Sequence, residues 1–381
     1  MSDEKTKIKN LVFKSYALKK PLSVAPDGSF LNACDLASQP SLAIGSLHAL
    51  SEDLQIKLAL ERNRMEPDFR LGIIGIGLIS KAEVLEHIEA QSELGQTFVR
   101  AEISYANELV GALAGGPAKK WALIPKAKAE RVPSDWKWVP QRWWPFLRSW
   151  ALFCENTTDQ VTTPAAAYRI KHVHPVFKAR GFVVKSLDGV NDVRVNFIPI
   201  ARMKRTVYLS GIGHGSPTTY TGHMGDPILR VGAYDQAEVK GKSIHFLSCQ
   251  TAKQLGPDTV QKGAKSYCGY FENFTFVWDD QNTPINEQEL FWKADSTYDI
   301  MMANGATSDV AYKATIAAFN AAMALVPGTA AATWLKWDRD IFRAPAINAV
   351  YGDKAAKISP FILLPNSPFM EAEEMFERFG V

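Results

Sequence analysis

Cysteine and long apolar runs are both scarce in this chain of 381 residues. Four cysteines, Cys34, Cys154, Cys249 and Cys268, are too few for the disulfide framework of a small secreted scaffold. We therefore expect thiols, each serving either packing or chemistry. The longest apolar stretch, at 71–79, is far shorter than the roughly 20 residues that a membrane-spanning helix needs.

The chain also lacks a strong excess of charge of either sign. The net charge is +3 with 22% charged residues, which is too weak to predict nucleic acid or an anionic membrane as the main partner. Residues 1–10 are charged and contain no apolar segment, unlike a signal peptide. We therefore expect a cytoplasmic protein with no membrane span. Hydrophobic residues make up 46% of the chain, which is enough for a sizeable core.

The sequence pattern divides the chain into three parts. Apolar residues before position 114 recur mainly at helical spacing, which predicts a mainly helical N-terminal domain over 1–113. Residues 114–148 are rich in proline, tryptophan and lysine, as in a connector between domains. Strand and helix patterns alternate over 149–381, which predicts an α/β domain with a mostly parallel sheet flanked by helices and a C-terminal helical extension. Within it, the alternation over 193–200 favours an added hairpin.

Two of the predicted strands end in residues that carry chemistry. The strand at 206–212 runs into Gly213-His214-Gly215, and the strand at 243–247 runs into Ser248-Cys249. Ligands of parallel sheets bind beyond the carboxyl ends of strands, so neighbouring strands would bring His214 and Cys249 to one edge. There the imidazole can move protons while the thiolate attacks a carbonyl. The main-chain N–H groups of Gly215 and Cys249 are the candidate oxyanion donors.

The order and spacing of these motifs resemble those of a known family. A strand ending in His-Gly, followed 35 residues later by a strand ending in Cys, is similar to the clan CD, caspase-like, cysteine peptidases. The segment 255–270 looks like the helix–turn–strand that follows the nucleophile in the CHAT and gingipain-type branches. The resemblance spans roughly residues 150–320. It implies a caspase-like fold and a cysteine endopeptidase that acts on proteins or peptides, with no cofactor and no metal.

The resemblance also indicates where specificity is determined. In such peptidases a charged pocket residue often lies just after the first strand or beyond the strand that follows the nucleophile. Both places are acidic here, which favours substrates with Lys or Arg at the cleaved position. The candidate substrate-binding residues are Glu155, Asp159, Glu272, Asp279 and Asp280. The chain has Leu-Ser-Cys where caspases have Gln-Ala-Cys, so a preference for aspartate is not implied.

Several alternatives stay open from the sequence alone. The chain can be a catalytically inactive interaction module that keeps the fold, or a nucleotide-binding protein that uses the glycines of 72–77. A zinc site made from His214, His223, His245 and Cys249 matches no common ligand spacing. An activating or inhibitory protein partner is also open, as is self-processing within the basic connector.

Overall fold

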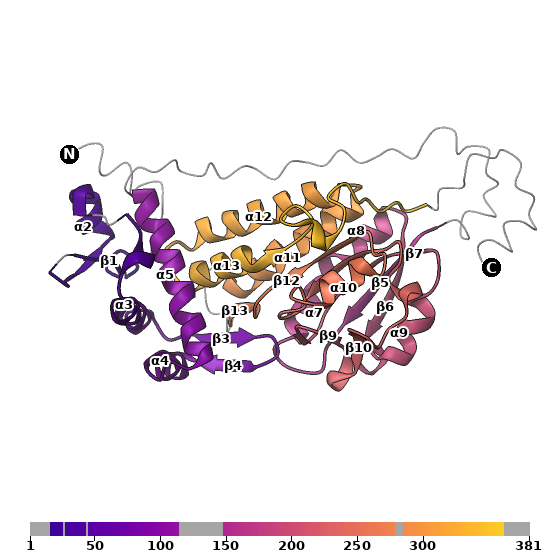
Figure 1. Ribbon diagram of the computed structural model, residues 1–381, viewed down its shortest axis with the longest axis horizontal. Coiled ribbons are helices and arrows are strands. Elements are labelled where there is room, and N and C mark those ends of the chain that lie inside the picture. The colour runs from indigo at the N-terminus through magenta and orange to yellow at the C-terminus, as the bar shows by residue number, and fades with distance from the viewer. Residues whose placement is uncertain (1–15, 26, 43–44, 114–147, 279–284, 362–381) are drawn as a thin grey trace, which may run out of the picture. The chain divides into compact units, whose positions relative to one another are not determined.

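The computed structural model describes residues 16–25, 27–42, 45–113, 148–278 and 285–361 (Figure 1). These residues form two compact units, each assembled from segments that are far apart in the sequence. The first unit takes the described residues before 114 together with Thr275–Ala294 and Ile316–Ile341. The second takes 148–274, Asp295–Thr315 and the residues from Phe342 onward. Of the predicted connector at 114–148, only Arg148 belongs to the described residues.

Helices and two small antiparallel sheets make up the first unit. Its elements are β1 (Pro21–Val24), β2 (Phe30–Asn32), α2 (Ala33–Ser38), α3 (Glu52–Arg64), β3 (Arg70–Ile73), β4 (Gly77–Ser80), α4 (Lys81–Glu89), α5 (Glu93–Leu113), β13 (Thr275–Trp278) and α13 (Ala330–Ile341), with short 3-10 turns at Pro40–Leu42 and Leu47–Ala49. At the start of α4 the hydroxyl of Ser80 accepts from the N–H of Glu83, and the Glu83 carboxylate accepts from the N–H of Ser80. Helices α11 (Glu287–Ala303) and α12 (Ser308–Leu325) contribute residues to both units.

The glycine-rich stretch at 72–77 forms a β-hairpin. Strand β3 pairs antiparallel with β4 and, on its other side, with β13. A Cβ at Gly72 would lie 2.2 Å from Cζ of Phe276, so glycine is needed there for packing between strands. The stretch returns as a strand and does not open a helix, and this geometry does not fit the nucleotide-loop alternative.

The second unit is built around a six-stranded sheet. Its strands are β5 (Trp150–Glu155), β6 (Val183–Asp188), β7 (Thr206–Ile212), β11 (Ser243–Leu247), β12 (Ser266–Tyr270) and β14 (Phe342–Arg343), and its helices are α7 (Thr163–His172), α8 (His174–Ala179), α9 (Arg194–Ala201) and α10 (Leu255–Gln261). The strand order is β14-β12-β11-β7-β5-β6. Five strands run parallel and β14 is antiparallel, so the predicted mostly parallel α/β sheet is confirmed.

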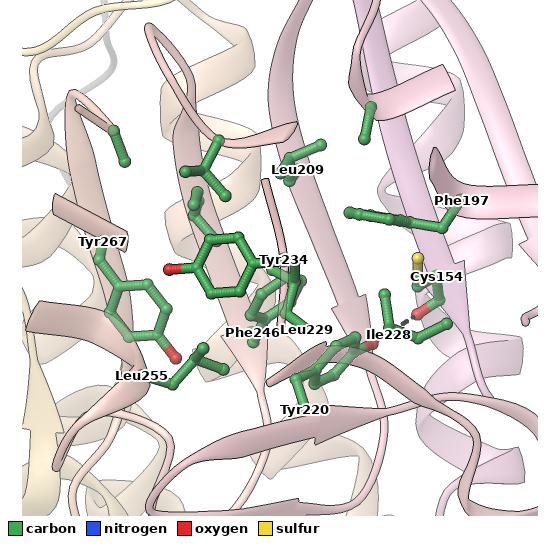
Figure 2. Close-up of a cluster of buried hydrophobic side chains, with 14 of the residues drawn as sticks. Cys154, Phe197, Leu209, Tyr220, Ile228, Leu229, Tyr234, Phe246, Leu255 and Tyr267 are labelled. Carbon is green, nitrogen blue, oxygen red and sulfur yellow. Dashed lines mark hydrogen bonds between the residues drawn. The ribbon is translucent and has the colours of Figure 1, made fainter. Parts of the chain in front are cut away.

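The central strands are buried on both faces, as expected for a parallel sheet covered by helices. Figure 2 shows one side of this core, where Phe197 of α9 and Leu255 of α10 pack with Leu209 and Phe246 of the sheet. On this side the Tyr220 hydroxyl donates to the carbonyl oxygen of Cys154 at 3.1 Å. Burial raises the pKa of the Cys154 and Cys268 thiols, which therefore remain protonated parts of the core.

The segment predicted as a hairpin at 193–200 is instead the helix α9. Its buried residues Phe197 and Ala201 lie one helical turn apart, whereas Val195 is 73% exposed. The alternation of apolar residues there did not reflect two faces of a strand. A small antiparallel sheet follows His214 instead, formed by β8 (Gly215–Ser216), β9 (Thr219–Thr221) and β10 (Pro227–Arg230). A 3-10 turn at His223–Gly225 lies between β9 and β10, and another at Gln236–Glu238 follows β10.

The strand order also indicates where a ligand would approach the sheet. From β5 the chain adds β6 on one side of β5 and then β7 on the other, so the direction of sheet growth reverses between β5 and β7. In open α/β sheets such a reversal leaves a crevice at the carboxyl ends of the two strands, where ligands bind. His214 follows β7 at this edge. No helix in the described part of the chain is long and apolar enough to cross a membrane.

Candidate active site

His214 and Cys249 leave the sheet from neighbouring parallel strands at the same level. Ile212, the last residue of β7, pairs with Leu247, the last residue of β11. His214 and Cys249 each lie two residues beyond this pair. The N–H of Gly213 extends the pairing by donating to the Leu247 carbonyl oxygen at 3.4 Å. The structure thus brings the two predicted catalytic residues to the same edge of the sheet.

Gly215 lies against the chain segment that contains Cys249. A Cβ at this position would be 2.2 Å from the Ser248 Oγ and 2.4 Å from the Cys249 carbonyl oxygen. Only glycine permits so close an approach. The two residues proposed as oxyanion donors, Gly215 and Cys249, therefore belong to segments in direct contact.

Asp159 contacts His214 directly. Nε2 of His214 lies 2.8 Å from Oδ2 of Asp159, and both side chains are 32% exposed. Asp159 is itself held in place, since Oδ1 accepts from the N–H groups of Val161 and Thr162 and Oδ2 accepts from the Thr162 hydroxyl. These bonds form the turn that leads into α7, whose N-terminal end favours a negative charge.

The Asp159 contact determines which nitrogen of His214 can act as a base. Burial alone would raise the pKa of Asp159, but the hydrogen bonds from His214 and Thr162 outweigh it and hold the pKa well below its usual range. The ionised carboxylate accepts the proton on Nε2, so the lone pair of the tautomer that this contact favours lies on Nδ1. Within the described residues, Nδ1 has no hydrogen-bond partner, as required of a base awaiting a proton.

Cys249 is only 1% exposed. Its Sγ accepts a hydrogen bond from the N–H of Phe274 at 3.3 Å. The next residue, Gln250, has φ of 59°, a left-handed conformation that is uncommon outside glycine. This sharp turn ends the strand direction directly after the thiol, and strain of this kind is typical of functional sites.

The predicted specificity residues differ in their surroundings. Glu155 is fully buried, with its carboxylate 3.1 Å from Nε of Arg169 and 3.0 Å from Nε2 of His174, so it presents no charge to a substrate. Asp159 directs its carboxylate to His214, so that carboxylate is engaged there and does not line a pocket on its own. Glu272 is partly exposed and bonds to Nζ of Lys253 at 2.9 Å. Asp279 and Asp280 lie outside the described residues.

Sequence reasoning missed Asn156, which fixes the loop after β5. Its N–H donates to the Ile212 carbonyl oxygen at 3.0 Å, and its Nδ2 donates to the Gly222 carbonyl oxygen at 3.0 Å. Its Oδ1 accepts from the N–H and the hydroxyl of Thr158. Asn156 therefore links the loop that carries Asp159 to the loop that follows His214. Asx turns of this kind give a weak sequence signal, because their long-range partners are not encoded locally.

A buried ionic cluster lies on the face of the sheet that carries His245. Nδ1 of His245 is 3.1 Å from Asp299 and its Nε2 is 3.3 Å from Asp295. Among the described residues, this is the group of histidine, cysteine and acidic side chains compact enough to hold a metal ion. Arg169 lies 2.9 Å from Asp299, however, so a fixed cation already neutralises the acids. Because His245 belongs to this cluster and His214 pairs with Asp159, the geometry does not fit the four-residue zinc alternative.

Comparison with known proteins gives no assignment: no family model, curated protein or solved structure matches the chain.

Proposed function

We propose that the chain is a cysteine endopeptidase of the caspase-like type, with Cys249 as nucleophile and His214 as acid–base. The observation that carries the proposal is the paired ends of β7 and β11, which bring His214 and Cys249 to one edge. The contact between His214 and Asp159 supports it, because a catalytic imidazole needs a partner that fixes its tautomer and orientation.

The reaction follows from these groups. Nδ1 of His214 takes the thiol proton, and Sγ of Cys249 adds to the carbonyl carbon of the scissile peptide bond. The resulting oxyanion is held by the N–H groups of Gly215 and Cys249. The imidazolium then protonates the leaving amine, which departs and leaves a thioester. Water, deprotonated by the same imidazole, then attacks the thioester. This step releases the acid product and regenerates the free thiol of Cys249.

The proposed specificity is for a basic residue at the cleaved position. Of the three described acids nominated from the sequence, Glu155 is engaged in the core and Asp159 orients His214. Glu272 is the one left to face a substrate. The main-chain oxygen of Glu272 accepts from the N–H of Gln250 at 3.2 Å, so Glu272 contacts the residue that directly follows the nucleophile. A carboxylate in this position favours the ammonium of lysine or the guanidinium of arginine.

The dyad is tested with single and double substitutions. Cys249→Ala and His214→Ala should each reduce turnover of a peptide substrate by about 10³-fold or more, and the double variant should lose no more than either alone, because the two groups act as a unit. Thermal melting should show that the variants remain folded. Normal turnover in Cys249→Ala would overturn the proposal. Absence of cleavage by every form, together with specific binding of a protein, would favour the inactive interaction module.

A further inference from the structure

We propose that residues 271–274 form a strap that keeps the Cys249 thiol covered, and that a basic substrate side chain opens it by competing with Lys253 for Glu272. This inference rests on the proposed role of Cys249 as nucleophile and adds how access to it is controlled. It assigns Glu272 and Lys253 a function as a matched pair.

The strap is tied to the segment around the nucleophile by four hydrogen bonds. The N–H of Gln250 donates to the Glu272 carbonyl oxygen at 3.2 Å, and Nε2 of Gln250 donates to Oδ1 of Asn273 at 2.9 Å. Lys253 donates to the Glu272 carboxylate at 2.9 Å. The fourth bond runs from the N–H of Phe274 to Sγ of Cys249. All four join residues 249–253 to residues 272–274, so each of them helps to hold the strap over the thiol.

This arrangement shields the Cys249 thiol from solvent and from a substrate. A nucleophile must approach a carbonyl carbon to about 3–3.5 Å, but Cys249 is 1% exposed and its sulfur already accepts a main-chain N–H. Phe274 is fully buried and its ring packs against Tyr270, with 4.8 Å between ring centres. The thiol can meet a substrate only after the strap has shifted.

In one of the four hydrogen bonds, the Lys253 side chain occupies the place that a basic substrate side chain would take. The Lys253 ammonium neutralises Glu272 as the side chain of a substrate lysine would, and the two groups are only 26% and 28% exposed. An incoming ammonium or guanidinium replaces one ion pair with another, so loss of the Lys253 tie costs little. A ligand that binds Glu272 only when Lys253 is displaced shifts the population toward the open strap.

The strap also leads directly into another element. Phe274 is followed at once by β13, which belongs to the first unit and pairs with β3. Phe274, whose N–H contacts the thiol, is therefore bonded directly to Thr275, the first residue of that strand.

The test measures access to the thiol without any peptide substrate. Cys249 and Cys34 are alkylated with iodoacetamide and followed by mass spectrometry, with exposed Cys34 as the internal reference. In the wild type, Cys249 should react much more slowly than Cys34. Glu272→Gln should speed reaction of Cys249 by about two- to fivefold, the range expected for a partly exposed ion pair. Asn273→Ala should also speed it without changing charge, and the double variant should exceed tenfold.

Two controls separate the strap from general loosening. The swap Lys253→Glu with Glu272→Lys should restore the wild-type rate. Methylguanidinium should accelerate alkylation of Cys249 in the wild type but not in Glu272→Gln. Tetramethylammonium, which cannot donate hydrogen bonds, should not accelerate alkylation in either protein. The inference is overturned if wild-type Cys249 reacts as fast as Cys34, if the variants leave its rate unchanged, or if the two cations act alike. If the strap behaves as stated but no peptide is ever cut, the proposed function fails and the strap does not.

Discussion

Asp159 shows how a residue can be located correctly from the sequence while its task depends on tertiary structure. It was nominated as a specificity residue because it follows the first strand of the α/β region. In the structure its carboxylate bonds to Nε2 of His214 at 2.8 Å and to the N–H groups that open α7. The carboxylate is thereby committed to orienting the imidazole.

This role makes a sharp prediction for Asp159→Asn. The amide keeps the shape but can donate to Nε2, which favours the wrong tautomer of His214, so turnover should fall by at least about tenfold with little change in KM.

Because pairing lowers the pKa of Asp159, its stabilising effect is present above the ordinary value near 3.9 and is lost as pH falls through the folded value. Wild type and variant should therefore converge in stability in strong acid. Asp188→Asn, at the exposed end of β6, is the matched control and should retain activity.

His214 and Cys249 could be nominated from sequence because each follows a buried strand directly. The contacts that decide what surrounds them could not. The bond between Asp159 and His214 requires β5 to lie beside β7, and the bond between Cys249 and Phe274 joins residues 25 apart. Strand order and loop closure depend on packing of the whole sheet, and local patterns carry no record of them.

Among the elements, the turn that follows β7 sets the distance between the segments that carry His214 and Cys249. Gly215→Ala would place a methyl group 2.4 Å from the Cys249 carbonyl oxygen, and the main chain would have to move. Displacements of about 1 Å at a catalytic site can cost roughly 10²-fold in rate, and we expect a loss of that order. The paired control is Gly111→Ala in α5, where the added Cβ would meet no atom within 4 Å apart from the neighbouring backbone of its own helix. Steady-state assays of both variants decide the point: equal activities would show that Gly215 does not set this distance.

The cluster around His245 links β11 to α11 and α7, and it predicts a pH dependence. Burial alone would lower the pKa of His245, but Asp299 and Asp295 outweigh it and raise it to about 9. A folded pKa above the ordinary value near 6.5 means that the stabilisation is fully present below about pH 6.5 and is lost as pH rises through 9. His245→Gln should therefore cost about 3 kcal/mol near neutral pH, and the cost should shrink toward pH 10.

Urea denaturation of the wild type and His245→Gln at several pH values measures this difference. His48→Gln, at an exposed position in the first unit, is the control and should show no such trend. A cost that stays constant from pH 6 to pH 10 would mean that His245 is neutral in the fold. The sequence alone does not reveal this cluster, because the acidic partners of His245 are about 50 residues away in α11.

For the whole molecule, the division into two units explains why the boundaries expected from the sequence are incomplete. Patterns along the chain indicated a helical part before 114 and an α/β part after 148. The first unit also takes β13 and α13, because β13 completes a sheet with β3 across about 200 residues. Long-range pairing of this kind is invisible to local periodicity. The mostly parallel sheet itself was predictable, since its strands are short apolar runs separated by helical segments.

The central claim is that Cys249 is a nucleophile activated by His214, and covalent capture tests it most directly. The whole chain is incubated with a peptidyl acyloxymethyl ketone that carries lysine at the cleaved position, and the modified residue is mapped by mass spectrometry. We predict an adduct on Cys249 that is lost in His214→Ala and is slower to form with an aspartate probe. An adduct confined to Cys34, or labelling of Cys249 that does not depend on His214, would contradict the claim.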